Sequence, residues 1–513
     1  MTGAPVWPGA VAVALVVVAT LAIGSLGLRL SRTTSDFMVA SRTVPAFTNA
    51  SAISGEYLSA ASFLGVAGLL LTFGADMLWY PVGWTAGYLV MLALVSAPLR
   101  RSGAYTLPDF AEARLGSRRV RTICSVLVVA VGWLYLLPLF QGAGVMLGAA
   151  LGLPTWIGPA GVASVVLVNV IGGGMRSITL VQAVQYWFKL TALLLPAAVL
   201  LAVWLGDGRP DTERLGRPDF PTDVLAWSNP LADGGAQGLY LTYALIAATF
   251  FGTMGLPHVV VRFYTNPDGR SARRSTLLVL ALLGLFYLVP PVYGALGRVY
   301  APELAASGES DLLVLLLPRI VVPGLGGDLL TGLVVAGAFA AFLSTSSGLA
   351  IAVAGVLGQD VTGRSWGGRR LGGVAAFRLG AVIAVVVPAA VALGEPSAGV
   401  ATTVGLAFAV AASTFAPLLM LGIWWRRLTP TGAGAGLVVG GLGSGAAALT
   451  TLYLDGPAGW VGVLAARPAL WSIPLATAVM MLVSLATQRT VPPGVRRFMV
   501  RLHTPEALDL DRG

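Results

Sequence analysis

The chain has 513 residues, of which 56% are hydrophobic and only 11% are charged, about half the charged share of an average soluble domain. The formal charge is +10, but the arginines stand in short segments between apolar runs, so membrane topology accounts for them and nucleic-acid binding does not. A single cysteine, Cys124, excludes an internal disulfide framework and a multi-cysteine metal site.

Apolar stretches long enough to cross a bilayer core of about 30 Å as helices recur along the whole chain. The sequence therefore predicts an all-α polytopic membrane protein with about 13 transmembrane helices. The expected spans cover residues 9–28, 44–73, 77–98, 122–150, 155–173, 178–205, 238–258, 275–297, 327–357, 374–393, 398–425, 433–453 and 471–487.

The arginines indicate the orientation. The first span has no basic residue before it and Arg29 and Arg32 after it, so we interpret it as an uncleaved span with its N-terminus outside. On that basis 25 arginines lie on the inner side and six on the outer side, the asymmetry typical of a cytoplasmic inner face, and the C-terminus lies inside. Lys189 lies within a span. The outer segment 206–237, rich in Pro and Gly, is interpreted as an ordered loop or lid.

Span 44–73 carries more polar groups than a lipid anchor needs. Gly55 gives the backbone freedom directly beside an acid, Glu56. This pattern is typical of a discontinuous helix, whose unwound carbonyls can coordinate a cation near the bilayer midplane. The alternative interpretation is a Ser/Gly face that packs against another helix.

A second polar cluster lies in span 327–357, where four hydroxyl residues follow one another from Ser344 to Ser347. Positions 341, 344, 345 and 348 share one helix face. Sodium prefers several oxygen ligands, so hydroxyls here and open carbonyls on another helix would suit it. Alternatively, these hydroxyls bond back to the carbonyls of their own helix.

A third unusual segment closes span 238–258. Gly252, Gly255 and Pro257 fall within six residues and predict a break near the inner face. We interpret His258 as an interfacial hydrogen-bonding residue and not as a metal ligand, because the only other histidine is His503 in the tail.

From about residue 29 to 430 the chain resembles the sodium:solute symporter family. The resemblance rests on SDFMVASRTVPAFTNASAISGEYLSAASFLGVAG (35–68), YTLPDFAEARLGSRRVR (105–121), GGGMRSITLVQAVQ (172–185) and AGAFAAFLSTSSGLAIAVAGVLGQD (336–360). FGTMGLPHVVVRFYT (251–265) is similar to the cation/acetate branch, which transports monocarboxylates.

The resemblance implies a core of two inverted five-helix repeats at 44–430, with the first and sixth core helices broken. An extra helix and inner loop would precede it at 1–43, two more helices would follow at 431–487, and 488–513 would form a cytoplasmic tail. It also implies a sodium site made by carbonyls of Gly55, Leu58 and Ala341 and hydroxyls of Ser344 and Thr345.

The resemblance, and nothing else in the sequence, also implies which residues line the solute pocket. They are Tyr57, Ser62, Tyr80, Thr253 and Gln141. Sugar-transporting members carry Glu-Gln where this chain has Ala61 and Ser62, which argues against a sugar. Many members carry an Asp, linked to a second sodium site, where this chain has Gln182, so the presence of that second site is left open.

The resulting hypothesis is sodium-coupled uptake of a short monocarboxylate such as acetate, a small organic anion, by alternating access across a bacterial cell membrane. No cofactor is expected beyond co-transported sodium, and Glu56 would take part in coupling. A proton-coupled carrier in which Glu56 titrates, a sodium symporter for proline or pyruvate, and a channel remain alternatives. An enzyme is not expected, since two histidines without neighbouring acids make no catalytic constellation.

Overall fold

The computed structural model describes residues 7–31, 33–210, 235–362, 372–394, 400–454 and 459–506. These residues are almost entirely helical, and none of them forms a strand. The principal helices are α1 (Trp7–Leu30), α2 (Thr34–Val39), α3 (Ala46–Tyr57), α4 (Val66–Phe73), α5 (Trp79–Val90), α6 (Ser96–Arg101), α7 (Leu107–Leu115), α8 (Arg118–Leu151), α9 (Ile157–Gly206), α11 (Gly235–Gly255), α12 (Pro257–Val261), α13 (Gly269–Tyr287), α14 (Pro290–Tyr300), α15 (Glu303–Ala306), α16 (Leu313–Val321), α17 (Leu325–Thr362), α18 (Gly373–Ala392), α19 (Val400–Trp424), α20 (Pro430–Tyr453), α21 (Trp460–Ala466), α22 (Ala469–Ala486) and α23 (Val495–His503).

Among the described residues, 11 helices are long and apolar enough to cross a membrane, or 12 if one bent pair counts as a span. About 13 spans were expected. The difference lies in α9, whose 50 residues count once but consist of two helices that meet at Gly174 and cover the expected spans 155–173 and 178–205. Such a helix would be about 75 Å long, more than twice the bilayer core. Gly174 interrupts it with φ 55° and ψ −150°, and a side chain there would collide with Phe37.

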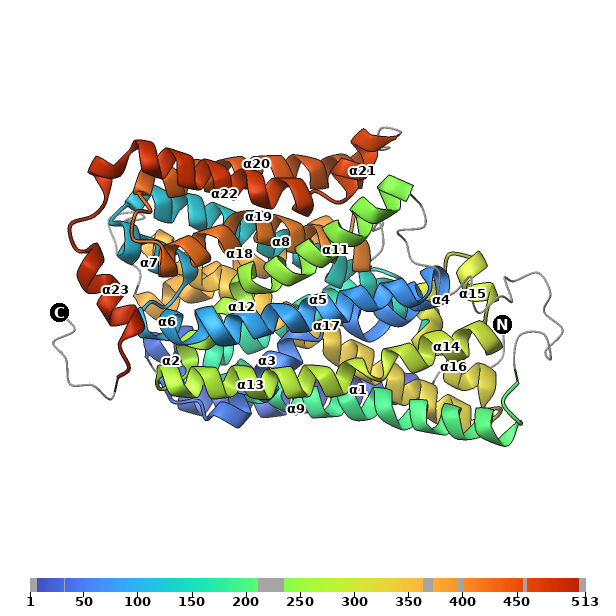
Figure 1. The fold of residues 1–513 in the computed structure, drawn as a ribbon. Helices are drawn as coiled ribbons and strands as arrows, with labels where there is room; N and C mark the ends of the chain where they lie inside the picture. The colour runs from blue at the N-terminus through green and yellow to red at the C-terminus, as the bar shows by residue number, and fades with distance from the viewer. Residues whose placement is uncertain are drawn as a thin grey trace.

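The first expected break is present. α3 ends at Tyr57, a π-helical turn η2 (Ala61–Gly65) leads into α4, and the axis bends by 69° between the two parts. The second is present as well, because α11 ends at Gly255, Leu256 is extended and α12 begins at Pro257. Both breaks lie inside the bundle, which Figure 1 shows as long helices running in roughly one direction.

The long helix α17 packs against many of the other helices. It packs against α1, α8, α9 and α18, while the broken helix α3 packs against α9, α13 and α17. The second broken helix, α11, packs against α5 and α19. Apart from α17, which contacts both α3 and α12, the two broken helices pack against different neighbours.

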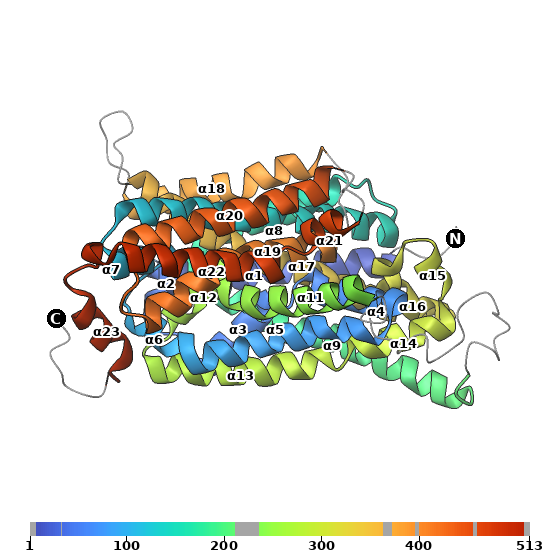
Figure 2. The same ribbon diagram turned by 45° about the horizontal axis from the view of Figure 1, so that its top comes forward.

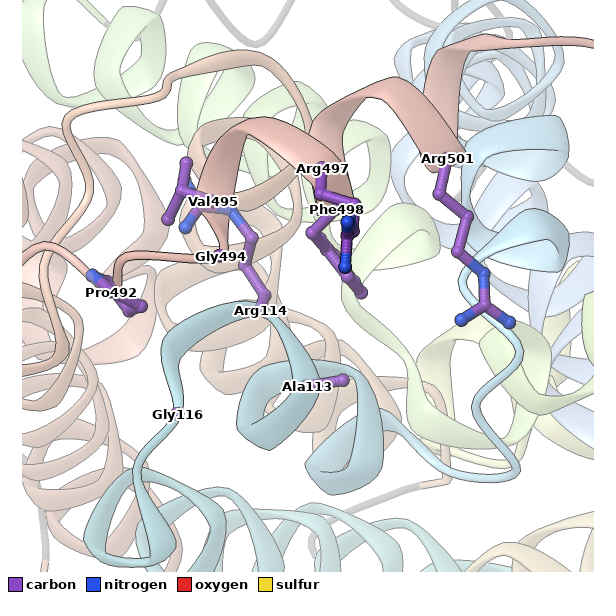
Figure 3. A pocket seen from close by; sticks show the side chains of 9 residues that line it. All are labelled: Ala113, Arg114, Gly116, Pro492, Gly494, Val495, Arg497, Phe498 and Arg501. Carbon is purple, nitrogen blue, oxygen red and sulfur yellow. The ribbon is translucent and has the colours of Figure 1, made fainter. Parts of the chain in front are cut away.

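Segments expected on the inner side meet at one end of the bundle, where α6, α7 and α23 lie, opposite α15 and α21 (Figures 1 and 2). Arg101 pairs with Glu506 at 3.1 Å, and Arg121 pairs with Asp109, Glu112 and Asp360 at 2.7–3.2 Å. A pocket of about 220 Å³ lies between α7 and α23 at this end, and Figure 3 shows the side chains that line it. Of the expected outer loop 206–237, residues 211–234 lie outside the described part.

Two interpretations from the sequence need correction. Arg262 is one of the 25 arginines assigned to the inner side, but it is 1% exposed and lies within the bundle, where a buried carboxylate binds it. His258, expected at the interface, is also 1% exposed, and its ring packs edge-on against Tyr135 at 5.6 Å. The break at Gly255–Pro257 turns both residues inward.

Candidate functional site

The first break exposes main-chain oxygens to the interior of the bundle. Leu58, with φ −72° and ψ 79°, leaves the helical conformation, so the carbonyls around it lose part of their helical bonding. Gly55 lies against the carbonyl of Gln182 on α9, an approach too close for any side chain. The packing role and the ligand role proposed for this segment thus meet in one residue.

The structure brings the five predicted sodium ligands together. Gly55 and Leu58 of α3 face Ala341, Ser344 and Thr345 on one side of α17. Thr345 Oγ1 donates across to the carbonyl of Glu56 at 2.6 Å, whereas Ser344 Oγ donates back to the carbonyl of Ala341 at 3.1 Å. The hydroxyl run therefore bonds in part across to α3 and in part back to its own helix, as the alternative interpretation anticipated for the latter.

A side chain from α9 lies among these groups. The Nζ atom of Lys189 donates to the carbonyls of Gly55 and Leu58 (2.7 Å to Leu58) and to Ser344 Oγ at 2.9 Å. Lys189 is fully buried. Three of the five predicted ligand positions are thus hydrogen-bonded to an ammonium.

Beside it lies a buried ion pair. Glu56 Oε2 accepts from Arg262 Nε at 2.5 Å, and the two side chains are 2% and 1% exposed. Arg262 also donates to Gln182 Oε1 and, at 2.9 Å, to Thr179 Oγ1. The expected coupling acid therefore has a partner, which a carboxylate in a membrane interior requires.

Gln182 joins the ion pair to the cation position. Its Nε2 donates to the carbonyl of Ser344 at 2.6 Å, while its Oε1 accepts from Arg262. The residue that replaces the family's Asp thus acts as a neutral bridge between α9, α17 and the segment after α12.

The solute residues expected from the resemblance lie around a group of rings that we term the aromatic cluster. Its ring centroids lie 4.9–6.3 Å from their neighbours, and all its members are buried. The cluster consists of Tyr57, Trp84, Tyr88, Tyr135, Tyr287 and Phe408.

Four of the five expected solute residues contact this cluster. Tyr57 belongs to it and shares a 2.5 Å hydrogen bond with Thr253, and Ser62 shares one of 3.0 Å with Tyr287. Tyr80 lies at its edge, 5.3 Å from the ring of Trp84, and accepts from Arg467 at 3.1 Å. Gln141 lies farther along α8, half-buried, beside the Gly142 that packs on Phe342.

Several polar atoms in and beside the cluster are unsatisfied. Within the part of the chain that the structure describes, Trp84 Nε1, Tyr88 Oη and both ring nitrogens of His258 are buried without a hydrogen-bond partner. Each such group costs about 1–3 kcal/mol unless it finds a partner. A polar ligand bound at the cluster could supply the missing partners of these four atoms.

Lys189 and Arg262 are the residues that the sequence interpretation missed. A signal existed for Lys189, since it is the only lysine of the chain and stands inside an apolar span, where an ionisable residue has a functional role by default. Arg262 gave no such signal, because it follows a predicted break and looks like the first basic residue of a loop.

The long apolar helices, one of them broken, define a multi-pass membrane protein. Two solved transporters share the fold. A Na+-coupled sialic acid symporter in a substrate-bound outward-open state has a TM-score of 0.66 and 14% identity over 93% of this chain and 98% of its own. Mhp1, a nucleobase-cation-symport-1 family transporter with bromovinylhydantoin bound, has a TM-score of 0.53 and 14% identity over 91% and 98%.

Residues 37–440 match the model of the sodium:solute symporter family, and the chain belongs to that family. The uncharacterized symporter YwcA of Bacillus subtilis (strain 168) is 30% identical over 427 residues, which are 82% of each chain. The chain is therefore a transporter and not an enzyme, and its membership supports sodium-coupled uptake of a solute.

Proposed function

We propose that the chain takes up a short monocarboxylate, such as acetate, by cation-coupled alternating access. The observation that carries the proposal is the set of unpaired donors at the aromatic cluster. Trp84 Nε1 can only donate, and the Tyr88 hydroxyl and one nitrogen of a neutral His258 can donate as well. A carboxylate accepts several hydrogen bonds and adds little volume, so it matches this set.

The same cluster is unsuited to a sugar. The Tyr57 hydroxyl is already paired with Thr253, and the Ser62 hydroxyl with Tyr287. A hexose would bring many hydroxyls into a site with few free partners, and each one left unpaired costs about 1–3 kcal/mol. The replacement of the Glu-Gln pair by Ala61 and Ser62 points the same way.

Alternating access would use the two breaks. Helix segments that meet at a break can change their relative angle without unwinding a continuous helix. Tyr57 ends α3 at the first break, and Thr253 lies two residues before α11 ends at the second. Their hydrogen bond supports a solute position between the two broken segments.

Two driving ions have support. Family membership favours sodium, which would cancel the charge of a monoanion that otherwise costs about 2.3 kcal/mol per 100 mV to bring inward. A proton-driven carrier is the second candidate. The position of Lys189 among the predicted sodium ligands favours it, because an ammonium there competes with a second cation.

The test is uptake of labelled acetate into vesicles that hold the full chain. Excess propionate or pyruvate should block it, whereas glucose, galactose and proline should not. Imposing a sodium gradient and a pH gradient in turn identifies the driving ion. Inhibition by a hexose or by proline, with none by any monocarboxylate, would replace the substrate class.

A matched pair of variants tests the pocket. Tyr88→Phe removes a hydroxyl that has no partner in the described chain, so it should raise the KM for acetate about tenfold, leaving stability unchanged. Tyr186→Phe removes a hydroxyl bonded to the carbonyl of Leu282 at 2.9 Å, away from the cluster. It should lower the Tm with the KM unchanged. Equal KM values for Tyr88→Phe and the unaltered chain would remove Tyr88 from the pocket.

A further inference from the structure

The single lysine of the chain has an unusual position. Lys189 lies near the middle of the second part of α9, and none of its surface is exposed. Lysines in membrane helices ordinarily extend their long side chain toward an interface. This one turns toward the break in α3, so its burial must be offset by specific partners.

The partners match an ammonium. Nζ of Lys189 has three acceptors: the carbonyls of Gly55 and Leu58 and the hydroxyl oxygen of Ser344. Ser344 Oγ uses its own hydrogen toward the carbonyl of Ala341 and is free to accept. Three acceptors satisfy the three N–H donors of a charged lysine, which accepts no hydrogen bond itself.

The charges of the neighbouring groups are consistent with one cation at this position. Glu56 of α3 faces this position, and Arg262, from the turn after α12, neutralises it at 2.5 Å. Gln182 of α9 and the hydroxyls of α17 are neutral. Lys189 therefore leaves one net positive charge in the group, which is the charge that a bound sodium ion would bring.

A sodium ion does not fit the same groups as they stand. Three of its five expected ligands already bind Nζ, and Thr345 Oγ1 is directed to the carbonyl of Glu56. An ion placed there would displace these bonds and meet a like charge in a site of low dielectric. All five expected ligand positions are present, but they are already hydrogen-bonded to other groups of the protein.

We propose that the ammonium of Lys189 is a tethered cation that takes the place of sodium at the α3–α17 site. It links the broken helix to α9 and α17 in the way a bound ion would, and the site itself contributes no sodium dependence. The inference concerns the ion and stands independently of the solute proposed above. It also predicts that removing the side chain uncovers a sodium site.

The experiment compares the unaltered chain, Lys189→Ala, Lys189→Ala with Ser344→Ala, and Lys189→Met. The readout is the Tm of the purified full chain without solute, in about 100 mM sodium against the same concentration of N-methylglucamine. Sodium should raise the Tm of Lys189→Ala by about 2 °C or more, and that of the unaltered chain by less than about 0.5 °C. Adding Ser344→Ala should abolish the gain. Lys189→Met, which fills the space without charge, should show none.

Uptake gives a second measurement in the same proteins. Without sodium, the uptake rate of Lys189→Ala should be at least about tenfold lower than that of the unaltered chain. Adding sodium should restore it. The proposal is overturned if sodium stabilises the unaltered chain as much as Lys189→Ala, or if Lys189→Ala gains no sodium response by either readout. Failure of acetate uptake by the unaltered chain would instead remove the proposed substrate, because the Tm comparison needs no solute.

Discussion

The two helix breaks of this molecule are built in opposite ways. At the first, between Tyr57 and Ala61, the freed carbonyls are bound by a buried lysine, and a buried Glu–Arg pair lies alongside. At the second, between Gly255 and Pro257, glycines bring the helix against α19. Side chains at Gly252 and Gly255 would strike the main chain of Phe408 and Ala411.

The contrast shows that a break does not by itself make an ion site. The first break is satisfied by charged side chains from α9 and from the segment after α12, so its stability depends on charge. The second is filled by close backbone packing against α19, so we expect it to be sensitive to added volume. Perturbing charge should therefore damage the first break, and adding volume should damage the second.

The largest effect is expected from Glu56→Gln. The change leaves Arg262 and Lys189 buried without the carboxylate that compensates them, and breaking such a pair costs about 3–5 kcal/mol. Transport should be lost at every pH, and the Tm should fall. Vesicle uptake and thermal unfolding in detergent measure the two effects.

Glu112→Gln is the matched control. It removes a carboxylate bonded to Arg121 at 2.7 Å, but that side chain is 33% exposed and Arg121 keeps other partners. The expected loss is below about 1 kcal/mol, with transport retained. Normal transport by Glu56→Gln would show that the buried pair serves neither structure nor coupling.

A smaller effect is expected from Gly255→Ala at the second break. The added methyl would meet the carbonyl of Ala411 and the amide nitrogen of Ala416, and main-chain atoms cannot easily move aside. Overpacking of this kind costs about 1–3 kcal/mol and should slow transport because the second break is displaced. Sodium responses should not change, since no ion ligand is touched.

Gly284→Ala serves as its control, because a side chain at Gly284 meets nothing within 4 Å. That variant, on the membrane helix α13, should match the unaltered chain in both Tm and uptake rate. If Gly255→Ala behaves in the same way, the packing account of the second break is wrong.

The fold could be predicted from the sequence because its signals are local. Apolar runs long enough for a bilayer, and Gly and Pro at the two breaks, follow from residue types at short spacing. The division of α9 into two helices follows the same rule, because the kink lies at Gly174, where φ is 55° and a side chain would collide with Phe37.

The site could be predicted only in part. The family resemblance predicted that the oxygens of Gly55, Leu58 and Ser344 lie together. Their hydrogen-bond partner in the structure is Lys189, which is 131 to 155 residues away along the chain. No local pattern states which helix a buried lysine faces. The same holds for Arg262, whose carboxylate partner is 206 residues distant. The predicted and observed sites therefore differ in two charged side chains, Lys189 and Arg262, whose partners are distant along the chain.

The smallest effect concerns the hydrogen bond between Tyr57, at the first break, and Thr253, beside the second, at 2.5 Å. Tyr57→Phe and Thr253→Val should each cost about 1 kcal/mol, and the double variant less than the sum, because the second change removes a bond already lost. A coupling energy of about 0.5–1.5 kcal/mol from unfolding in detergent would support direct linkage of the breaks. Thr253 also donates to the carbonyl of Thr249 at 2.7 Å, so Thr253→Ser, which keeps the hydroxyl, provides the control. Strictly additive effects would show that the charged break and the packed break move independently.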